Sequence, residues 1–365
     1  MRRVLAMFFV YPIFFYGFIL GNSENFSKIV KKVSPSLVRV RSWVAHAEPS
    51  PHFDMVGNAT GTVISSDGYI LTNAHLVTYQ GSLKRFDRTE VLITGHKYVE
   101  AKVIGVDPEN DLALLKVNAP ALWLPIKTIE LEKKPRKILG QMVVKGGFPG
   151  AVISNNLTFA HGFITNERAF FEDYSTPYYV LDLRISLGDS GGPVLNSKGR
   201  IIAISTLMFI SDSMSLLVPA HIVNRVLPRL YKGDKRTGWL GINPSHCLNV
   251  EDVWRDDNLK KNTEEYLKKH KANLPNLSRG IIIMVFADQV VGDAKLLRIG
   301  DTITKINGKI PQDRQELVQW IAEQEPGSKI ELAIVRNGKQ MTLKLNVGEY
   351  KWKTPEVATR PSGHF

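Results

Sequence analysis

The stretch Gly188-Asp189-Ser190-Gly191-Gly192-Pro193 is the most informative part of this sequence, because it places a serine on a glycine-rich turn between apolar segments. Glycine adopts backbone angles that other residues avoid, so the chain can bend sharply here and turn its amide groups toward one point. We therefore expect the backbone N–H groups of Gly188 and Ser190 to face a common site beside the Ser190 hydroxyl. A chance glycine loop is the alternative, and the length of the run argues against it.

A serine hydroxyl is a poor nucleophile near neutral pH, and it needs a base, a group that orients the base, and donors for the oxyanion that forms. The candidate base is His75, which follows an apolar segment. The candidate orienting acid is Asp111, because a carboxylate that opens a buried strand is costly unless it is paired, and an imidazole would pair it. Two residues compete: His161 lacks a comparable motif, and Asp107 precedes a proline, which is typical of a turn.

The order along the chain is His75, Asp111, Ser190, which is that of the chymotrypsin arrangement of this triad. An α/β-hydrolase is the rival, because a glycine-flanked serine also fits its nucleophile elbow. That elbow must open a helix, and it needs a histidine after the serine. Here residues 193–199 lead through a turn into another apolar run, so the sequence favours the chymotrypsin type.

Short apolar runs separated by turn residues continue from about residue 33 to residue 205 and predict a mostly β sandwich or barrel. A helix is predicted from Pro219 to Leu230, because the apolar residues there recur at helical spacing. Residues 233–237 are polar, begin with Gly233 and are followed by Gly238, which indicates a linker. We therefore assign residues 24–232 to one domain.

A second compact unit is predicted over residues 238–348. Alternating runs at residues 302–306 and 329–336 each end in an Asn-Gly pair, a signal for a hairpin turn, and a helical pattern lies between them. Two hairpins and one helix describe a small, partly open β-barrel. Residues 243–279 form a charged insertion, interpreted as a solvated helix or a mobile segment, and residues 349–365 form a tail.

The composition excludes several function classes. Of the 365 residues 44% are hydrophobic and 22% charged, an ordinary globular mixture. The net charge of +12 is either an attraction to anionic surfaces or lysine scattered over a solvated surface; we favour the second and expect no nucleic-acid partner. The single cysteine, Cys247, excludes an intramolecular disulfide. With no metal-binding cluster and no nucleotide loop in the sequence, we expect neither a metal nor a cofactor.

The first 23 residues have the pattern of an export signal. Met1-Arg2-Arg3 is basic, residues 4–20 are a 17-residue apolar run, and small residues follow at Gly21 and Ser23. Cleavage after Ser23 fits this pattern. A retained membrane anchor is the alternative, because a run of this length is near the lower limit for a membrane-spanning helix. Either outcome places the rest of the chain outside the cytoplasm.

Together these motifs resemble the HtrA/Deg family of extracytoplasmic serine proteases, of the DegP-like and DegS-like kind with one PDZ domain. The resemblance covers roughly residues 26–348 and rests on residues 68–75, 111–117 and 188–193 and on a junction segment at residues 238–242. It implies a chymotrypsin-like double β-barrel protease domain followed by a PDZ domain.

One departure from the family pattern lies beside the nucleophile. The family usually has asparagine before the serine, whereas this chain has Asp189. In trypsin-like zymogens an acid at this position pairs with a newly formed N-terminal amine. The sequence shows no activation site suited to that, so the role of Asp189 stays open at this stage.

The resemblance also implies where the specificity pocket lies. Its wall would come from the segment before the nucleophile and from a later strand, with Ile185, Leu187, Leu216 and Leu217 as the candidate residues. These side chains are apolar and offer no charge to a basic substrate residue, so cleavage after small or medium aliphatic residues is predicted. The alternative is that they are simply core residues.

The second unit resembles a PDZ domain. Its carboxylate-binding loop would be Gly238-Trp239-Leu240-Gly241, and a peptide would add as a strand beside Ile242. An ordinary strand start flanked by glycines is the alternative. The resemblance further implies a homotrimer assembled through N-terminal residues, with Phe26 as a candidate contact.

The function implied is a serine endopeptidase that degrades misfolded proteins outside the cytoplasm, most simply in the periplasm, or that performs regulated cleavage if the anchor is retained. The rival is a peptide-binding chaperone with little or tightly regulated proteolysis. Degradation of an unfolded protein by the native chain and by Ser190→Ala separates the two.

Overall fold

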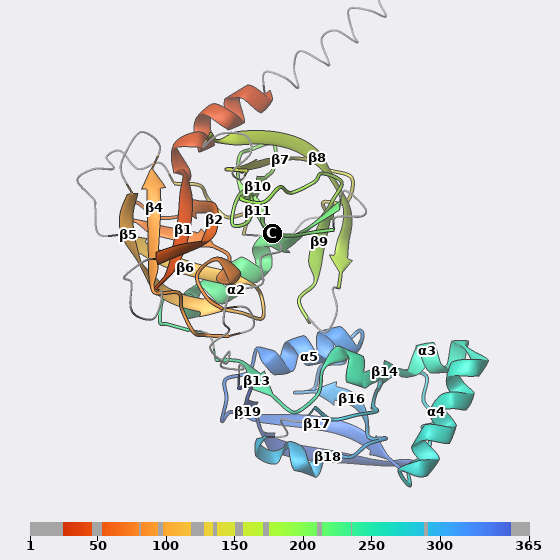
Figure 1. Ribbon diagram of the computed structural model, residues 1–365. Helices are drawn as coiled ribbons and strands as arrows, with labels where there is room; N and C mark the ends of the chain where they lie inside the picture. The colour runs from red at the N-terminus through yellow and green to blue at the C-terminus, as the bar shows by residue number, and fades with distance from the viewer. Residues whose placement is uncertain are drawn as a thin grey trace, which may run out of the picture. The chain divides into compact units, whose positions relative to one another are not determined.

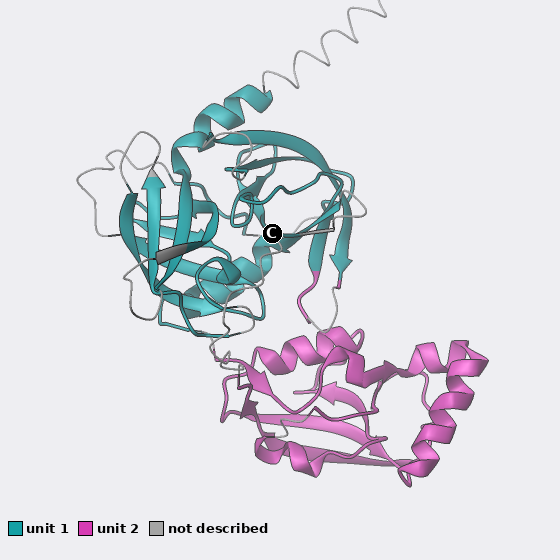
Figure 2. Cartoon of the chain, viewed as in Figure 1, with its two compact units in different colours: residues 1–169, 178–234, 354–365 teal, residues 170–177, 235–353 magenta. Residues whose placement is uncertain are grey.

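The computed structural model describes residues 25–45, 53–79, 82–93, 98–117, 128–133, 137–149, 156–170, 175–209, 214–234, 236–287 and 291–351. The chain divides into two compact units (Figure 2). Unit 1 comprises Met1–Ala169, Tyr178–Asp234 and Thr354–Phe365, and unit 2 comprises Phe170–Pro177 and Lys235–Lys353. The predicted signal or anchor at residues 1–23 lies outside the described residues, as does most of the predicted tail.

The first half of unit 1 is a closed six-stranded barrel (Figure 1). Its strands follow the order β1-β2-β3-β6-β5-β4, and each neighbouring pair is antiparallel. Valine and other aliphatic side chains fill the interior, among them Val38, Val40 and Val91. The strands are β1 (Leu37–Ala45), β2 (Phe53–Val63), β3 (Tyr69–Thr72), β4 (Arg88–Ile93), β5 (Tyr98–Asp107) and β6 (Leu112–Val117).

The second half of unit 1 is another closed barrel with the same topology. Its order, β7-β8-β9-β12-β11-β10, repeats that of the first barrel strand for strand. Two closed barrels confirm the predicted mostly β, double-barrel class and remove the exposed strand edges that an open sheet would carry. The strands are β7 (Met142–Gly147), β8 (Thr158–Ala169), β9 (Tyr178–Leu181), β10 (Pro193–Leu195), β11 (Ile201–Phe209) and β12 (Met214–Pro219).

Two helical segments flank the barrels. Residues 25–33 are helical and continue into the 3-10 helix η1 (Ser34–Ser36) before β1. Helix α2 (Ala220–Leu230) follows β12 and buries an apolar face that includes Ile222, Val223 and Val226, as the spacing predicts. Among the residues that the structure describes, no helix is both long and apolar enough to cross a membrane.

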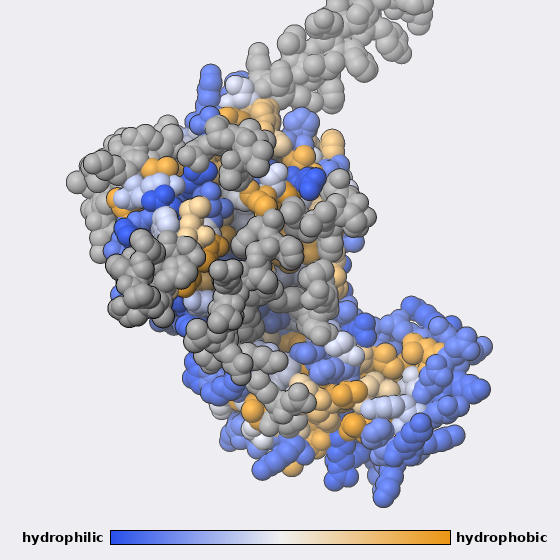
Figure 3. All heavy atoms as spheres, in the orientation of Figure 1, coloured by the Kyte–Doolittle hydropathy of each residue, from blue (hydrophilic) through white to orange (hydrophobic). Residues whose placement is uncertain are grey.

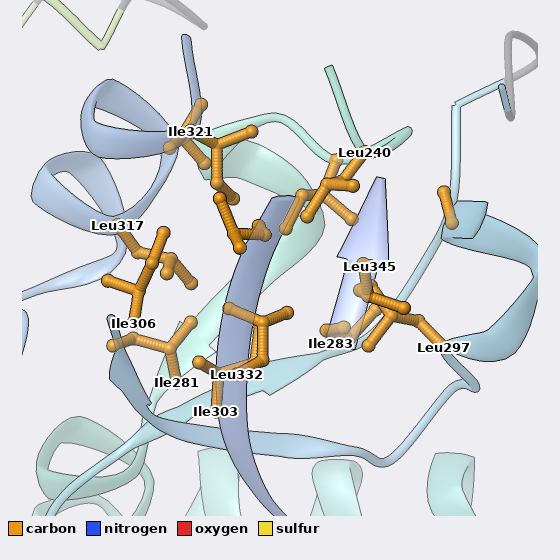
Figure 4. Packing of buried hydrophobic residues seen from close by; sticks show 14 of the residues in the cluster. Leu240, Ile281, Ile283, Leu297, Ile303, Ile306, Leu317, Ile321, Leu332 and Leu345 are labelled. Atoms are coloured by element: carbon orange, nitrogen blue, oxygen red, sulfur yellow. The ribbon is translucent and has the colours of Figure 1, made fainter. Parts of the chain in front are cut away.

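Unit 2 is built on a five-stranded antiparallel sheet of order β14-β15-β16-β17-β18 and on a two-stranded pair, β13 with β19. Helix α5 (Arg314–Ala322) and the sheet enclose an aliphatic core, shown in Figure 4 with Leu317, Ile321 and Leu332 among its members. The strands are β13 (Gly238–Trp239), β14 (Cys247–Asn249), β15 (Ile281–Ile283), β16 (Thr302–Ile306), β17 (Lys329–Arg336), β18 (Lys339–Asn346) and β19 (Gly348–Glu349).

Of the two predicted hairpins in unit 2, the structure contains one. Asn337 and Gly338 connect β17 to β18, and both have the positive φ that a two-residue hairpin turn requires. Asn307 and Gly308 also form a tight turn, but only a single bridge, between Ile306 and Lys309, closes it. Strand β16 pairs instead with β17, so the expected first hairpin is wrong: the chain leaves this turn for α5 rather than for a return strand.

The charged insertion is folded. It contains α3 (Val250–Arg255) and α4 (Asp257–Lys269), and the Asp256 carboxylate caps α4 by accepting the N–H groups of Asn258 and Leu259. Its charged side chains give the α4 region its hydrophilic colour in Figure 3. The inner faces form a second apolar cluster with β15, made of Val250, Val253, Leu267, Ala272 and Ile282.

Candidate active site

His75, Asp111 and Ser190 each lie at the end of a strand rather than within one. His75 is in the 3-10 helix η2 (Ala74–Leu76) just after β3, Asp111 immediately precedes β6, and Ser190 lies on the turn before β10. Strands β3 and β6 are hydrogen-bonded neighbours, with Thr72 opposite Ala113. The histidine and the aspartate therefore meet at one end of this strand pair.

The Asp111 carboxylate holds His75 by two contacts. Its Oδ1 accepts the backbone N–H of His75 at 3.0 Å, and its Oδ2 lies 2.8 Å from His75 Nδ1. Asp111 has a φ of 49°, a left-handed conformation that is uncommon outside glycine but tolerated by aspartate. With Nδ1 committed to the carboxylate, Nε2 is the ring nitrogen left to exchange a proton with a substrate or a nucleophile.

The electrostatics at His75 favour its protonated form. Burial lowers the pKa of the imidazole, but the negative charge of Asp111 and the hydrogen bond to it raise the pKa by more, so the net value lies above the ordinary 6.5. The His75 side chain is still 35% exposed, and that of Asp111 is 16% exposed. The pair is therefore accessible to a bound substrate.

A β-bulge at Thr206 links the two barrels at the site. In the pairing of β11 with β12 the register shifts between Ser205 and Leu207, so Thr206 has no partner opposite it. Its hydroxyl donates to Asp111 Oδ2, and its carbonyl accepts the Ser190 hydroxyl at 3.1 Å. Bulges commonly re-aim side chains next to active sites, and this one places Thr206 in contact with both Asp111 and Ser190.

The Ser190 hydroxyl is directed at the Thr206 carbonyl in this structure. Within the described part of the chain, no hydrogen bond joins Ser190 Oγ to the His75 ring. In sites without substrate such bonds are often long or unformed and become established when substrate binds. A rotation of the Ser190 side chain about χ1 would release its hydroxyl from the Thr206 carbonyl.

The glycine turn leaves two backbone N–H groups, at Gly188 and at Ser190 itself, without an acceptor in the described residues. The N–H groups of Asp189, Gly191 and Gly192 all donate within the protein. Gly188 has a φ of 99°, which a side chain would strain. The free pair is the arrangement that an oxyanion hole requires.

Thr60, on β2 of the first barrel, anchors this turn. Its N–H donates to the Ser190 carbonyl at 3.0 Å, and its hydroxyl donates to the Gly188 carbonyl at 2.7 Å. Sequence reasoning missed both Thr60 and Thr206, because neither lies in a motif and only the closure of the barrels brings them to the site. Asn73, whose side-chain amide donates to the Asp111 carbonyl at 2.8 Å, could have been found from its place two residues before His75.

The two competing residues are engaged elsewhere. The Asp107 carboxylate accepts the Asn110 side-chain amide at 2.6 Å and its N–H at 3.3 Å, as expected of a turn residue. The His161 ring packs edge-on against Phe26 with centroids 5.9 Å apart.

The candidate pocket residues lie in different environments. Ile185 and Leu217 belong to the hydrophobic core of the second barrel, and Leu216 is also buried. Leu187, which directly precedes the glycine turn, is 48% exposed. The Ser215 hydroxyl joins the two segments, because it accepts the Ile185 N–H and donates to the Leu183 carbonyl, both at 2.8 Å.

The candidate carboxylate loop of unit 2 begins in β13. Gly238 and Trp239 pair with β19, while the side chains of Leu240 and Ile242 are buried in the aliphatic core. No acceptor for the N–H groups of Leu240, Gly241 and Ile242 occurs in the described ranges. Beyond Ile242 the chain is not a strand: Asn243 caps the 3-10 helix η4 (Pro244–His246).

The fold and the site define a class: a trypsin-like peptidase domain followed by a PDZ domain. The family model for the trypsin-like peptidase domain matches residues 59–204, and that for the PDZ domain matches residues 260–347. Among solved structures, the HtrA-type protease AlgW with a decapeptide superposes with a TM-score of 0.68 at 20% identity, covering 90% of this chain and 99% of that one. A serine endoprotease from Yersinia pestis gives a TM-score of 0.62 at 21% identity, covering 89% and 98%.

Sequence relatives agree with the fold. The chain is 28% identical to a probable periplasmic serine endoprotease, DegP-like, of Ectopseudomonas mendocina over 313 residues, which are 83% of this chain and 59% of the relative. It is 28% identical to the protein of the same name from Brucella suis, covering 82% of this chain and 54% of the relative. The chain thus spans between half and two thirds of the length of these relatives. Its two matched domains and these relatives make the chain similar to the HtrA/Deg family of serine endoproteases with one PDZ domain.

Proposed function

We propose that this chain acts as a serine endopeptidase on misfolded proteins outside the cytoplasm, through a Ser-His-Asp acyl-enzyme mechanism. The observation that carries the proposal is the contact network in which Asp111 holds His75 at 2.8 Å while Thr206 contacts both Asp111 and Ser190. A nucleophile, a base and an orienting acid from three separate segments share one site.

In the proposed reaction, Ser190 Oγ attacks the carbonyl carbon of the scissile peptide bond while His75 Nε2 takes the hydroxyl proton. The resulting oxyanion accepts hydrogen bonds from the N–H groups of Gly188 and Ser190. The imidazolium then donates its proton to the leaving amine, and an acyl-Ser190 ester remains. Water, activated by His75 in the same way, hydrolyses the ester and restores the serine.

The cellular setting is proposed from two observations. The relatives carry the word periplasmic in their names, and residues 1–23 have the basic, apolar and small-residue pattern of an export segment. Either a cleaved signal or a retained anchor would deliver the catalytic unit to the same compartment. Mass measurement of the mature N-terminus distinguishes the two, because only cleavage removes these residues.

We propose a preference for small or medium aliphatic residues before the scissile bond. Support comes from the apolar side chains of Leu187 and Leu216, which offer no charge to a lysine or arginine. Cleavage-site profiling of a peptide library tests this preference. Selection of lysine or arginine at that position would overturn it.

For unit 2 we propose recognition of protein C-termini at Gly238–Ile242. The available N–H groups of Leu240, Gly241 and Ile242 support binding of a terminal carboxylate. Strand addition past Ile242 is limited, since the Asn243 N–H donates to His246 Nδ1 at 3.3 Å and Pro244 has no N–H. A peptide with a free C-terminus should therefore bind better than its amidated form in a fluorescence-anisotropy titration, and equal affinities would contradict this.

The proposed assembly is a homotrimer that forms through N-terminal residues, with Phe26 as a contact. Phe26 is partly exposed on the helix of residues 25–33 and already packs against His161. Light scattering on the native chain and on Phe26→Ala tests this. A monomeric native chain would refute the proposal.

Degradation of casein by the native chain and by Ser190→Ala tests the proposed activity. Removal of the nucleophile of such a triad costs on the order of 10⁶ in kcat, so the variant should be inactive. Equal degradation by both would end the protease proposal. A native chain that binds casein but cleaves none would instead support the chaperone alternative.

A further inference from the structure

A buried ion pair lies directly behind the nucleophile turn. Lys145, on β7 of the second barrel, contacts Asp189 Oδ2 through its ammonium group, and the two side chains are only 7% and 0% exposed. We propose that Lys145 is a positioning residue. By holding the Asp189 carboxylate, it fixes the orientation of the oxyanion donors, the N–H groups of Gly188 and Ser190. This inference rests on the proposed acyl-enzyme mechanism and goes beyond it, because it names what holds the two oxyanion donors in place.

Asp189 ties the turn together at several points. Its Oδ2 accepts the Ser186 N–H at 2.8 Å as well as the Lys145 ammonium. Its own N–H donates to the Ser186 carbonyl, and its carbonyl accepts the Gly192 N–H, both at 2.9 Å. A single residue therefore fixes the turn on both sides of the nucleophile.

The position of Asp189 in the chain connects this pair to the donors. Gly188 and Ser190, the residues with available N–H groups, are its immediate neighbours. A change in the backbone of Asp189 reorients the peptide units on either side of it, and hence these donors. The donors act only if they already point to where the oxyanion forms, because such sites stabilise charge by preorganisation.

The Asp189 carboxylate is buried against β7, where a glycine leaves room for it. Gly147 lies on β7 beside it, and a Cβ at that position would come within 2.5 Å of Asp189 Oδ1. This Oδ1 is buried and has no hydrogen-bond partner in the described residues, so the Lys145 ammonium is the main compensation for the buried charge. Removing one partner of a buried ion pair leaves an uncompensated charge, which is strongly unfavourable.

Without the ammonium, the Asp189 carboxylate would be left buried and uncompensated, which favours any movement that brings it to water. Rotation of the carboxylate outward would carry the 188–190 backbone with it and disperse the donors. In trypsin-like zymogens, the acid before the serine pairs with an N-terminal amine that forms only when the chain is cleaved. Lys145 supplies the positive charge from within the barrel, so the oxyanion turn forms without cleavage of the chain.

Measurement of kcat and KM on a peptide substrate, for the native chain and for Lys145→Met, tests the proposal. Loss of an oxyanion donor costs about 10²–10³ in kcat, and Lys145→Met should lose a similar factor with little change in KM. Lys145→Gln keeps a donor without the charge and should give an intermediate kcat. Each rate is divided by the folded fraction from thermal melting, which separates positioning from stability.

The double variant Lys145→Met/Asp189→Asn supplies the rescue. It removes both charges and places at 189 the residue that the family usually has, so most of the kcat lost in Lys145→Met should return. Lys116→Met, which removes a lysine paired with Asp67 at 3.6 Å on the first barrel, is the matched control and should keep native kcat. Native kcat in folded Lys145→Met or Lys145→Gln, or a double variant that is folded but no more active than Lys145→Met, would overturn the proposal.

Labelling of Ser190 by a fluorophosphonate distinguishes failure of this proposal from failure of the proposed function. A native chain that is not labelled would refute the acyl-enzyme mechanism itself. A native chain that is labelled, with Lys145→Met labelled at the same rate, would refute only the positioning role of Lys145.

Discussion

At the residue scale, the contacts around His75 support its proposed role as the base and bear on the pH range in which it would act. Both oxygens of Asp111 are engaged, one by the His75 backbone and one by its ring and by Thr206. The carboxylate therefore has little freedom to leave the imidazole. Orientation of the imidazole by the acid contributes strongly to the rate in a triad, since replacing the acid by its amide lowers kcat by a factor on the order of 10⁴ in such sites.

The pH dependence of activity follows from the raised pKa of His75. Burial lowers this pKa, but the charge of Asp111 and the hydrogen bond to it raise it above 6.5. Only neutral His75 accepts the Ser190 proton, so kcat/KM should fall tenfold per unit as the pH drops below this pKa. The midpoint of the acid limb, measured on the free enzyme's kcat/KM profile, is expected above 6.5. A midpoint well below 6.5 would contradict the assigned pairing.

The three residues of the proposed triad could be chosen from the sequence because each lies in a local motif next to a strand. Thr60 and Thr206 could not, because their roles come from the register of β2 and from a bulge in β11, which no short stretch of sequence encodes. Lys145 was missed for the same reason. It is a lysine within an apolar strand, and only the approach of the turn at residues 186–192 gives it a partner.

At the element scale, the bulge in β11 accounts for how one strand serves two barrels. The extra residue frees Thr206 from the ladder with β12, so its carbonyl and hydroxyl both reach the site. In a regular strand, residue 206 would lie opposite a partner on β12, and its backbone N–H and carbonyl groups would form hydrogen bonds within the sheet. The bulge is therefore part of the site and not an irregularity at its border.

Thr206→Val tests this use of the bulge. The substitution keeps the shape of the side chain but removes the hydroxyl that donates to Asp111 Oδ2. A hydrogen bond to a charged group contributes about 1.5–3 kcal/mol, so kcat should fall by roughly tenfold or more. Thr206→Ser retains the hydroxyl and should keep most of the activity. Native kcat in Thr206→Val, measured by peptide hydrolysis, would show that the contact is dispensable.

The elements of unit 2 show where sequence patterns misled. The Asn-Gly pair at residues 307–308 forms the predicted turn but no hairpin, because the next residues lead to α5. The charge of the insertion predicts a solvated helix or a mobile segment, and the helical alternative agrees with α4, most of whose residues are exposed or half-buried. The insertion is a helix pair with a buried inner face, because Val250, Val253 and Leu267 pack against β15. A sparse apolar face within a charged run was the missed signal.

At the scale of the whole molecule, each unit has its own apolar core, so each can unfold by itself. The single cysteine offers a direct report on unit 2. Cys247 is fully buried in the core of that unit. Burial raises the pKa of its thiol to about 12, although the positive charge of Arg314 lowers it in part.

Cys247 is therefore expected to be unreactive in the native protein. Thiolate is the reactive form, and both its scarcity and its burial block a disulfide reagent such as dithionitrobenzoate at neutral pH. Addition of urea should raise the labelling rate in step with unfolding of unit 2, and circular dichroism on the same samples provides the control. Fast labelling of the native chain without denaturant would contradict the buried position.

Local sequence patterns were enough to predict the class of this protein. The glycine turn around Ser190, the order of His75 and Asp111 before it, and the alternation of apolar runs lead to a mostly β, chymotrypsin-like unit and a PDZ-like unit, because these signals are local. The surroundings of Ser190 could be known only from the folded chain. Thr60, Lys145 and Thr206 come from strands of two closed barrels, and barrel closure and strand register, which depend on the whole chain, bring them to the turn. Asp189, the unexplained residue of the motif, acquires a partner only there.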